Sequence, residues 1–303
     1  MEYLERHAES KLAPAAILPG CQAVIVVALG YYQAEPPAAP RSASATGRVA
    51  RYAWGRDYHK TIQKRLRALR ADLQAAAPDA RFQTGSDATP LLETYFAAQA
   101  GLGFRGKHTL VINGQLGSWF FLGEVLSTVA VEPYGRPTSK RCGSQCTHCI
   151  DVCPTRAIVG PYQLDASRCI SYLTIEHRGP VDPELRPLMG DWLFGCDLCQ
   201  EVCPWTVRAR ATTEPDFLNQ RAGATPELAE ILTLRGHEDM VARFAGSPLM
   251  RAGRDRLVRN ACTVAANVGA RALLPQLRAL QNDADPGVAE HARWAVARLG
   301  TTD

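Results

Sequence analysis

Cysteine spacing constrains this 303-residue chain more than any other feature of its sequence. Two groups of cysteines lie between residues 142 and 204, and each group ends in a Cys-Pro pair. The eight cysteines of this segment are Cys142, Cys146, Cys149, Cys153, Cys169, Cys196, Cys199 and Cys203. Such groups are typical of proteins with two iron–sulfur clusters, in which the cysteine before proline binds the other cluster.

The same rule predicts how the cysteines are shared, because eight thiolates suffice for two four-iron clusters. The first cluster is expected on Cys142, Cys146, Cys149 and Cys203. The second is expected on Cys153, Cys169, Cys196 and Cys199. Tight loops between the cysteines should direct backbone N–H groups at the sulfurs, which tunes the reduction potential. We therefore predict a ferredoxin-like domain over residues 139–210.

Two other uses of the cysteines fit the sequence less well. The first spacing, Cys142 to Cys146, is one residue longer than in the bacterial ferredoxin run, although such a loop still reaches an iron. Structural zinc sites also use CxxC pairs, but zinc leaves the repeated CxxxCP unexplained. Disulfides are disfavoured because no secretory leader opens the chain, which indicates a reducing cytoplasm.

Composition and charge set further bounds. With 46% hydrophobic and 21% charged residues, the chain can bury a core and is expected to form two or three domains. No uncharged apolar run is long enough for a membrane span, so no membrane association is expected. The net charge is only +4, but basic residues concentrate in residues 48–70 and 235–259. These stretches suit a polyanionic partner, and solvated helix faces have the same composition.

The pattern before the cysteines indicates an α+β domain that ends near residue 138. The expected elements are a buried strand over 23–29, a loop over 33–45, helices over 57–76 and 90–100, and strands over 109–113 and 118–122. After the cysteines, residues 225–299 have a helical pattern throughout. Residues 272–280 and 288–299 resemble one HEAT-type repeat, a helix pair that stacks on its neighbour.

Five segments in the same order resemble one enzyme family. They are residues 47–59, 101–108, 117–124, 168–176 and the stretch from Phe194 onward. Along nearly its whole length the chain is similar to epoxyqueuosine reductases. The resemblance implies a cobalamin-binding, reductive-dehalogenase-like domain over residues 1–138, shortened by about one helix–strand–helix unit before Met1. It also makes residues 211–303 a HEAT-like, tRNA-binding region.

The resemblance implies a cytoplasmic, monomeric oxidoreductase. Its reaction would reduce epoxyqueuosine to queuosine at the wobble position of tRNA, the last step of queuosine biosynthesis. Electrons from an unidentified donor would pass through two [4Fe-4S] clusters to cobalamin, and the anticodon stem-loop of tRNA would be the macromolecular partner. The arginines of residues 235–259, among them Arg251, Arg254 and Arg259, are expected to hold the RNA backbone.

The family also implies a proton donor, since the departing oxygen must be protonated. Its Asp-x-x-Pro-Leu-Leu-Glu motif reads here from Asp87 through Pro90 to Glu93, which assigns the acid to Asp87. From the residues alone, Asp87 is instead the N-cap of a helix that starts at Pro90.

The resemblance implies corrinoid contacts, and several of them are made through backbone atoms. These residues are Arg6, Tyr52, Asp87, His108, Val111, Leu122 and Ser171. Residues 57–59 resemble the start of the DxHxxG signature for an axial histidine, but Ile62 replaces the required glycine. No lower histidine ligand is therefore expected, and His59 and His177 are interpreted as surface or structural residues.

Two other classes of protein remain open from the sequence. A reductive dehalogenase of small organohalides would share the corrinoid domain and both clusters, but it needs no basic helical tail. A ferredoxin-like electron carrier would need only residues 140–205 and would have no use for Asp87.

Overall fold

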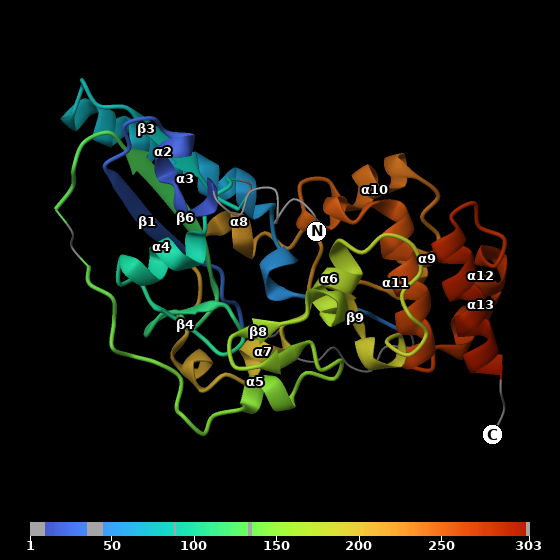
Figure 1. Ribbon diagram of the computed structural model, residues 1–303. Helices are drawn as coiled ribbons and strands as arrows, with labels where there is room; N and C mark the ends of the chain where they lie inside the picture. Colours follow the sequence, from blue (N-terminus) through green and yellow to red (C-terminus); the bar gives the residue numbers. More distant parts are fainter. Residues whose placement is uncertain (1–9, 35–44, 88, 133–134, 301–303) are drawn as a thin grey trace. The chain divides into compact units, whose positions relative to one another are not determined.

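The computed structural model describes residues 10–34, 45–87, 89–132 and 135–300 (Figure 1). It forms two compact units that interleave along the chain. The first unit contains residues 1–32, 58–146 and 203–212, and the second contains 33–57, 147–202 and 213–303. The three domains predicted from the sequence follow continuous segments instead, and that division stays a prediction. Arg6 and most of the predicted loop over 33–45 lie outside the described residues.

A three-stranded antiparallel sheet organises the first unit, with the strand order β1-β6-β3. Its strands are β1 (Ala23–Gly30), β6 (Phe120–Ser127) and β3 (Phe82–Gly85). The predicted strand over 23–29 is confirmed, but its predicted burial was wrong, because every residue of β1 is partly exposed. β1 is an edge strand with a partner on one side only, so its side chains are less completely covered than those of the central β6.

One helix packs on each face of this sheet. The predicted helix over 57–76 is confirmed as α3 (Tyr58–Ala76), which buries Ile62 and Leu66 against β6. Gly123 allows this close approach, since a Cβ there would lie 3.1 Å from the Leu66 side chain. α4 (Glu93–Gln99) packs against β6 and β1, where Ala97 meets an apolar cluster.

Two predicted elements of the first unit are shorter in the structure. The helix expected over 90–100 begins only at Glu93, because Leu92 is not helical and donates its N–H to the carbonyl of Lys11. The strand expected over 109–113 is reduced to β5 (Val111–Ile112), which pairs with β4 (Phe104–Arg105). Thr109 has a φ of 75°, a left-handed conformation that a strand cannot contain. A further short helix, α2 (Pro14–Ile17), precedes β1.

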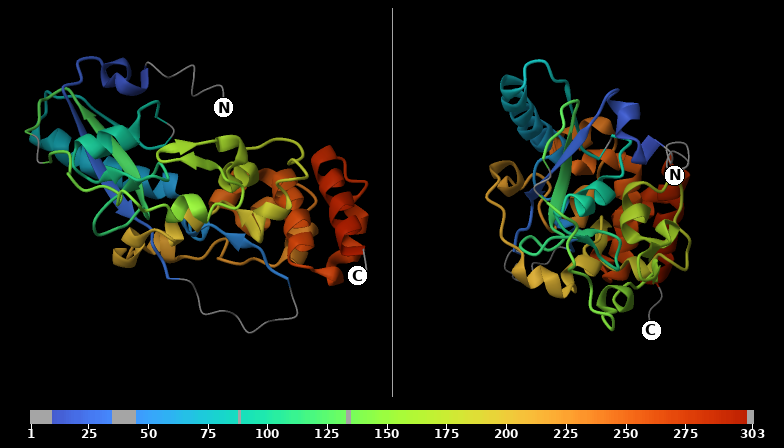
Figure 2. Two further views of the ribbon diagram at one scale, coloured as in Figure 1. Left: turned by 60° about the horizontal axis from the view of Figure 1, so that its bottom comes forward. Right: turned by 60° about the vertical axis from the view of Figure 1, so that its left-hand side comes forward.

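The second unit contains short strands and most of the helices (Figure 2). β2 (Arg48–Val49) pairs in parallel with β9 (Trp192–Phe194), and β7 (Ile158–Gly160) pairs with β8 (Gln163–Leu164). The helices between and after the cysteines are α5 (His148–Asp151), α6 (Ile170–Ile175), α7 (Leu198–Glu201), α8 (Pro215–Leu218), α9 (Leu228–Leu232), α10 (His237–Phe244), α11 (Gly253–Asn267), α12 (Leu274–Leu280) and α13 (Pro286–Gly300).

Helix α11 is the core of the second unit. It packs against α9, α13, α6 and β9, so residues 257–266 are all buried rather than divided between an apolar and a polar face. Gly269, at a φ of 70°, separates α11 from α12, and α13 packs on both helices. The largely helical tail predicted for residues 225–299 is confirmed, whereas its classification as a HEAT-type repeat stays a prediction.

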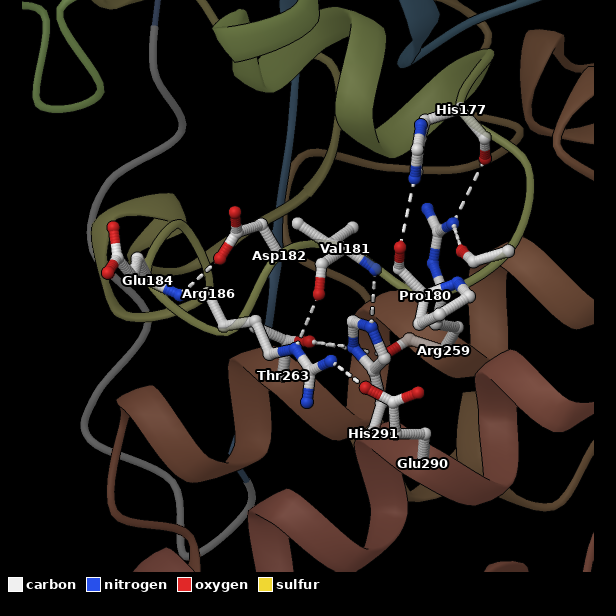
Figure 3. A network of polar contacts seen from close by, with 11 residues as sticks. His177, Pro180, Val181, Asp182, Glu184, Arg186, Arg259, Thr263, Glu290 and His291 are labelled. Atoms are coloured by element: carbon white, nitrogen blue, oxygen red, sulfur yellow. Dashed lines mark hydrogen bonds and ion pairs between the residues drawn. The ribbon is translucent and has the colours of Figure 1, made fainter.

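Polar side chains of α11 and α13 hold the loop that follows α6 (Figure 3). Arg259 is 1% exposed and donates to the carbonyls of Leu173, His177 and Gly179. His291 accepts the N–H of Val181 at Nε2, 2.9 Å away, and its Nδ1 lies 2.7 Å from the Thr263 hydroxyl. These bonds fix the start of the segment between α6 and β9 against the helical tail.

Candidate active site and cluster-binding segment

Asp87 occupies a tight turn immediately after β3. Its φ of 54° places a non-glycine residue in the left-handed region, which aspartate adopts in tight turns at some cost in strain. Two neighbours fix the turn: the Ser86 hydroxyl donates to the Leu122 carbonyl at 2.8 Å, and Gly85 leaves room for Thr89. A Cβ at Gly85 would lie 2.4 Å from the Thr89 hydroxyl oxygen.

The first turn of α3 supplies two partners of the Asp87 carboxylate. The Tyr58 hydroxyl donates to Oδ2 at 2.6 Å, and Nε2 of His59 lies 3.0 Å from the same oxygen. Tyr58 is buried and stacks on Phe121 with ring centroids 4.2 Å apart, so its position is fixed by packing. His59 therefore contacts the candidate acid, and its interpretation as a surface or structural residue stays a prediction.

The alternative role of Asp87 as a helix N-cap was wrong. α4 begins at Glu93, its N-cap residue is Leu92, and no side chain caps it. The Asp87 side chain is 48% exposed and makes its bonds to α3 instead. A strained, half-exposed carboxylate with a tyrosine and a histidine beside it has the arrangement of a general acid.

Two glutamates lie behind Asp87, and sequence reasoning did not assign either of them a role. Glu93, in the first turn of α4, accepts the backbone N–H of Asp87. Glu124, on β6 opposite Gly85, is fully buried and faces the Glu93 carboxyl. Burial and the nearby Asp87 carboxylate raise the pKa of Glu93 to about 7. Burial and the neighbouring Glu93 raise the pKa of Glu124 to about 9.

His108, a predicted corrinoid contact, is 4% exposed and lies in the first unit. Its Nδ1 accepts the N–H of Leu110 at 3.2 Å, which leaves the proton of the neutral ring on Nε2. Nε2 is buried and has no hydrogen-bond partner among the residues that the structure describes. Burial lowers the pKa of His108 to about 4, so the ring is neutral at physiological pH.

The other predicted corrinoid contacts fall on both units. Val111 and Leu122 belong to one apolar cluster of the first unit. Tyr52 packs at the edge of an apolar cluster of the second unit, and the Ser171 N–H is directed at the Cys169 sulfur. Whether these residues contact a corrinoid stays a prediction.

In the first unit, Cys203 lies close to two cysteines of the first group. Burial, together with the thiols of Cys142 and Cys146, raises the pKa of Cys203. Cys142 also packs with Cys203 beside Phe104. Three of the four cysteines predicted for the first cluster are thus neighbours, and the fourth, Cys149, lies on a segment of the second unit.

Lys107 explains how the long first spacing is accommodated. Its side chain is buried, and Nζ donates to the carbonyls of Gly143, Ser144 and Cys146 at 3.0, 2.9 and 2.8 Å. An ammonium group has three donors, so all of them are used within this one loop. The additional residue between Cys142 and Cys146 therefore belongs to a turn that is closed around Lys107.

The second unit brings together the four cysteines predicted for the second cluster. Burial raises the pKa of Cys196, and the nearby Cys169 and Cys153 add to this rise. Burial also raises the pKa of Cys199, with contributions from Cys196 and Cys169. A buried group of thiols is ionised readily only when cations compensate the charge, as the iron of a cluster does.

Backbone N–H groups point at several of these sulfurs. The Ala157 N–H donates to the Cys153 sulfur at 3.2 Å, and Leu198 and Trp205 direct theirs at Cys196 and Cys203. This is the arrangement expected around a four-iron cluster. Within the described ranges, no three Cys, His, Asp or Glu side chains converge on a single metal ion. Each thiolate of a cubane binds a separate iron, so its cysteines need no such convergence.

The C-terminal arginines differ from what the sequence predicted. Arg259 is buried, and Arg254 forms a bidentate ion pair with Asp283 that also lowers the pKa of that carboxyl. Arg256 donates to backbone carbonyls, and Arg251 pairs with Glu176. Arg254 and Arg259 are thus largely engaged within the fold and Arg251 stays exposed, so the RNA-binding role expected for these arginines stays a prediction.

Comparison with known proteins bears directly on this site. A family model described as "Epoxyqueuosine reductase QueG, DUF1730" matches residues 11–88, and one described as "4Fe-4S double cluster binding domain" matches residues 141–206. An epoxyqueuosine reductase from Pseudomonas aeruginosa is 43% identical over 100% of this chain and 84% of its own length. The chain belongs to the epoxyqueuosine reductase family. It is therefore an oxidoreductase with an iron–sulfur double-cluster domain.

Solved structures of the family have the same fold. An epoxyqueuosine reductase in complex with an epoxyqueuosine-modified tRNA stem-loop superimposes with a TM-score of 0.89 at 30% identity, over 97% of this chain and 77% of the other. The enzyme from Bacillus subtilis, in a form whose aspartate-bearing catalytic loop is swung out of the active site, has a TM-score of 0.89 at 31% identity, over 97% and 78%. The reductase of Escherichia coli is 39% identical over 98% of this chain and 78% of its own length.

Sequence reasoning missed the four side chains around Asp87, which are Tyr58, His59, Glu93 and Glu124. Tyr58 and His59 were visible as two polar rings at the start of an amphipathic helix. Glu93 was visible as the last residue of the Asp87 motif. Glu124 gave a further signal, since it is a lone carboxylate in the middle of an apolar strand, a position that charged residues rarely occupy without a partner.

No helix in the described part of the chain combines the length and the apolar character needed to span a bilayer.

Proposed function

We propose that this protein reduces epoxyqueuosine to queuosine in the anticodon loop of tRNA, with Asp87 as the proton donor. The observation that carries the proposal is the coincidence of family membership with the geometry at Asp87. The family's acid position is here a strained, half-exposed carboxylate that Tyr58 and His59 contact directly. Proton transfer to a departing oxygen needs an acid that is both fixed in position and accessible.

The reaction removes the epoxide oxygen. Both C–O bonds break, a carbon–carbon double bond forms, and the oxygen leaves as water, so each turnover consumes two electrons and two protons. Cobalamin, when bound, supplies low-valent cobalt for this reduction. The protein residues hold the substrate, exclude water and deliver protons at the departing oxygen. Tyr58 and His59 orient the Asp87 carboxyl for that delivery.

The electrons reach this site through two four-iron clusters. We assign Cys142, Cys146, Cys149 and Cys203 to the first cluster and Cys153, Cys169, Cys196 and Cys199 to the second. The grouping of Cys142, Cys146 and Cys203 in the first unit and of the second four in the second unit, with the N–H groups directed at their sulfurs, supports this assignment, and Cys149 is assigned from its place in the cysteine motif. The electron donor is a further protein or a small low-potential reductant.

Residues of this chain fit a corrinoid in one specific respect. His108 carries a buried N–H without a partner among the described residues, and a corrinoid offers many amide carbonyls that accept hydrogen bonds. We propose His108, Val111, Leu122, Tyr52, Ser171 and Arg6 as its contacts, with Asp87 facing the bound group. The domain is reductive-dehalogenase-like in this proposal, and the enzyme acts as a monomer.

The RNA backbone is held by helix α3 rather than by the C-terminal arginines. α3 starts at the Tyr58–His59 pair beside Asp87 and continues for 19 residues, a length of about 28 Å. Its exposed basic residues are Lys60, Lys64, Arg65, Arg67 and Arg70. A basic helix that begins at the acid can track phosphates while the splayed base enters the site. The HEAT-like tail then supports the cluster-binding segment, and a tRNA substrate is expected in the cytoplasm.

The test is a single-turnover assay with anaerobically purified protein, an epoxyqueuosine-containing stem-loop and dithionite, in which queuosine is measured by mass spectrometry. Cobalt and iron are counted per chain in the same preparation. We expect conversion that depends on cobalamin, with two four-iron clusters per chain. Turnover of small organohalides without conversion of the stem-loop would favour a dehalogenase. Iron without any corrinoid uptake would favour an electron carrier.

A further inference from the structure

Glu93 and Glu124 form a buried carboxyl pair that the reaction as described so far does not use. Glu124 lies in the middle of β6, opposite Val26 of β1 and Gly85 of β3. Gly123 faces α3, so the alternation along the strand turns the Glu124 side chain toward α4, whose first residue is Glu93. Glu124 is 0% exposed, and the carboxyl of Glu93 is its neighbour.

The surroundings of this pair require a retained proton. Neither oxygen of Glu124 receives a hydrogen bond from any described donor, although both are buried. Two ionised carboxylates in contact at such a place are strongly disfavoured, because each opposes the charge of the other and neither is solvated. One proton shared between the two carboxyls removes this conflict and satisfies an oxygen on each side.

The charged groups that face the pair are one carboxylate and one histidine. The turn after β3 contributes Asp87, and α3 contributes His59 and the Tyr58 hydroxyl, both of which contact Asp87. His59 is the nearest cation when it is protonated, and it lowers the pKa of Glu93 by less than burial raises it. β1 and β3 place the uncharged Val26 and Gly85 opposite Glu124. No fixed cation among the described residues compensates the pair.

The pair is also connected to the acid itself. Glu93 accepts the backbone N–H of Asp87, so a change of charge on Glu93 alters the strength of a hydrogen bond that holds the strained turn. The next step rests on the function proposed above. Loss of the epoxide oxygen as water needs two protons, and Asp87 alone carries one at most. A second proton has to reach the departing oxygen within the same turnover.

We propose that Glu93 and Glu124 are a proton-holding pair that supplies the second proton by reloading Asp87 after its first transfer. The proton leaves the shared site as Asp87 becomes an anion, and a proton from solvent enters through the partly exposed Glu93 in the same step, so the two glutamates are never both ionised. The two electrons come from the low-potential donor through the clusters. Glu93 and Glu124 act through Asp87 and are positioning residues in this scheme.

Infrared spectroscopy of the intact holoprotein tests the first half of the proposal without substrate. A protonated buried carboxyl has a C=O stretch that an ionised carboxylate lacks. We expect such a band in the wild type at neutral pH, its loss near pH 9 where Glu124 ionises, and its absence in Glu124→Gln. Glu214→Gln, which alters a buried glutamate of the second unit, should keep the band.

Single-turnover kinetics test the second half. The wild-type rate should fall above pH 9 as the pair loses its proton. The Glu124→Gln enzyme should not show this alkaline decrease in rate, and it should be at least about tenfold slower at neutral pH. Stem-loop affinity and thermal stability should stay close to wild type in this isosteric variant. Glu93→Gln should show the same two changes, and Glu214→Gln neither.

Three results would overturn the proposal. One is a wild type without a protonated carboxyl band that depends on Glu124. Another is a Glu124→Gln enzyme with the wild-type rate and alkaline limb. The third is a slow variant that keeps the alkaline limb and is less stable, which would make the pair only a packing element. A wild type that does not convert the epoxide would instead overturn the proposed function and leave the infrared result intact.

Discussion

Two histidines, one in each unit, are both buried and differ in what their ring nitrogens contact. In the second unit, His291 uses both nitrogens, one on the Val181 N–H and one on the Thr263 hydroxyl. In the first unit, His108 uses only Nδ1, and its buried Nε2 has no partner among the described residues. A buried polar group with every bond made stabilises a fold, whereas an unsatisfied one needs a partner from outside the chain, which water or a bound molecule can supply.

The charged residues of the two units differ in the same way. In the second unit, Arg254 and Arg259 have their donors engaged by Asp283 and by backbone carbonyls. In the first unit, Asp87 is strained and half exposed, and Glu124 is buried without a hydrogen-bond donor among the described residues. This difference supports the proposal that the first unit bears the chemistry, whereas Arg254 and Arg259 maintain structure in the helical tail. The following predictions test this difference between the two units.

The largest effect is expected at Asp87. Asp87→Asn keeps the size of the side chain and removes the transferable proton, so the single-turnover rate should fall at least about a hundredfold. Metal and corrinoid content should stay unchanged. Thermal stability should change little or increase, because Asp87 caps no helix and is strained.

Asp72→Asn is the matched control, since Asp72 is an exposed aspartate of α3. It should leave both rate and stability as in the wild type. An Asp87→Asn enzyme with a normal rate and a lower melting temperature would show that Asp87 has a structural role rather than a catalytic one.

The next effect is expected at Arg259. Arg259→Met leaves the buried carbonyls of Leu173, His177 and Gly179 without their donor, which should lower the free energy of unfolding by about 1–3 kcal/mol. Affinity for the stem-loop and its salt dependence should not change. Urea denaturation and RNA titrations measure the two quantities separately.

Arg278→Met provides the control, because Arg278 is an exposed arginine of the same helical tail. Its effect on stability should stay within about 0.5 kcal/mol. If Arg259→Met instead weakened RNA binding at unchanged stability, the tail would be the RNA-binding region predicted from the sequence.

A smaller effect is expected on α3. Replacing Lys60, Lys64 and Arg67 together with glutamine should weaken stem-loop binding by about tenfold. The slope of log affinity against log salt should fall by about two, because binding releases fewer counterions when phosphate contacts are lost. The matched variant replaces Arg251, Arg254 and Arg256 with glutamine. An unchanged salt slope in the α3 variant would remove this helix from the RNA interface.

The smallest effect separates the two histidines by pH. Burial, with the charges of Arg186 and Arg259, lowers the pKa of His291 to about 2 from an ordinary value of 6.5. Only the unfolded state then binds a proton below pH 6.5, so stability is complete above 6.5 and falls by about 1.4 kcal/mol for each pH unit below it. His108 adds a similar loss between pH 6.5 and about 4.

His291→Gln should remove one proton from this acid-side slope, measured by denaturation between pH 6.5 and 5. His108→Gln should remove the other. The two variants should also differ in cofactor retention, because corrinoid content should fall only when His108 is replaced. Equal corrinoid content in both would contradict the role given to the unsatisfied nitrogen.

Much of the site could be predicted because its signals are local. The spacing of Cys196 and Cys199 is that of a tight turn around one cluster, and Cys203, which precedes proline, is assigned to the other cluster. Backbone N–H groups of these turns point at the Cys196 and Cys203 sulfurs. The apolar repeat of α3 predicted its bounds to within a residue. The Asp87 motif marked the acid through its similarity to the family, although its local sequence favoured a helix cap.

The sequence by itself predicted the two cysteine groups and the long basic helix, because each depends on a pattern within a short stretch of chain, whereas the acid was assigned through similarity to the family. Only the tertiary structure decided which charges are available. Strand register placed Glu124 at Gly85 and hence beside Asp87, and the packing of α11 buried Arg259 under the loop after α6. A sequence pattern records the charge of a side chain, but its protonation and accessibility depend on distant segments that fold against it.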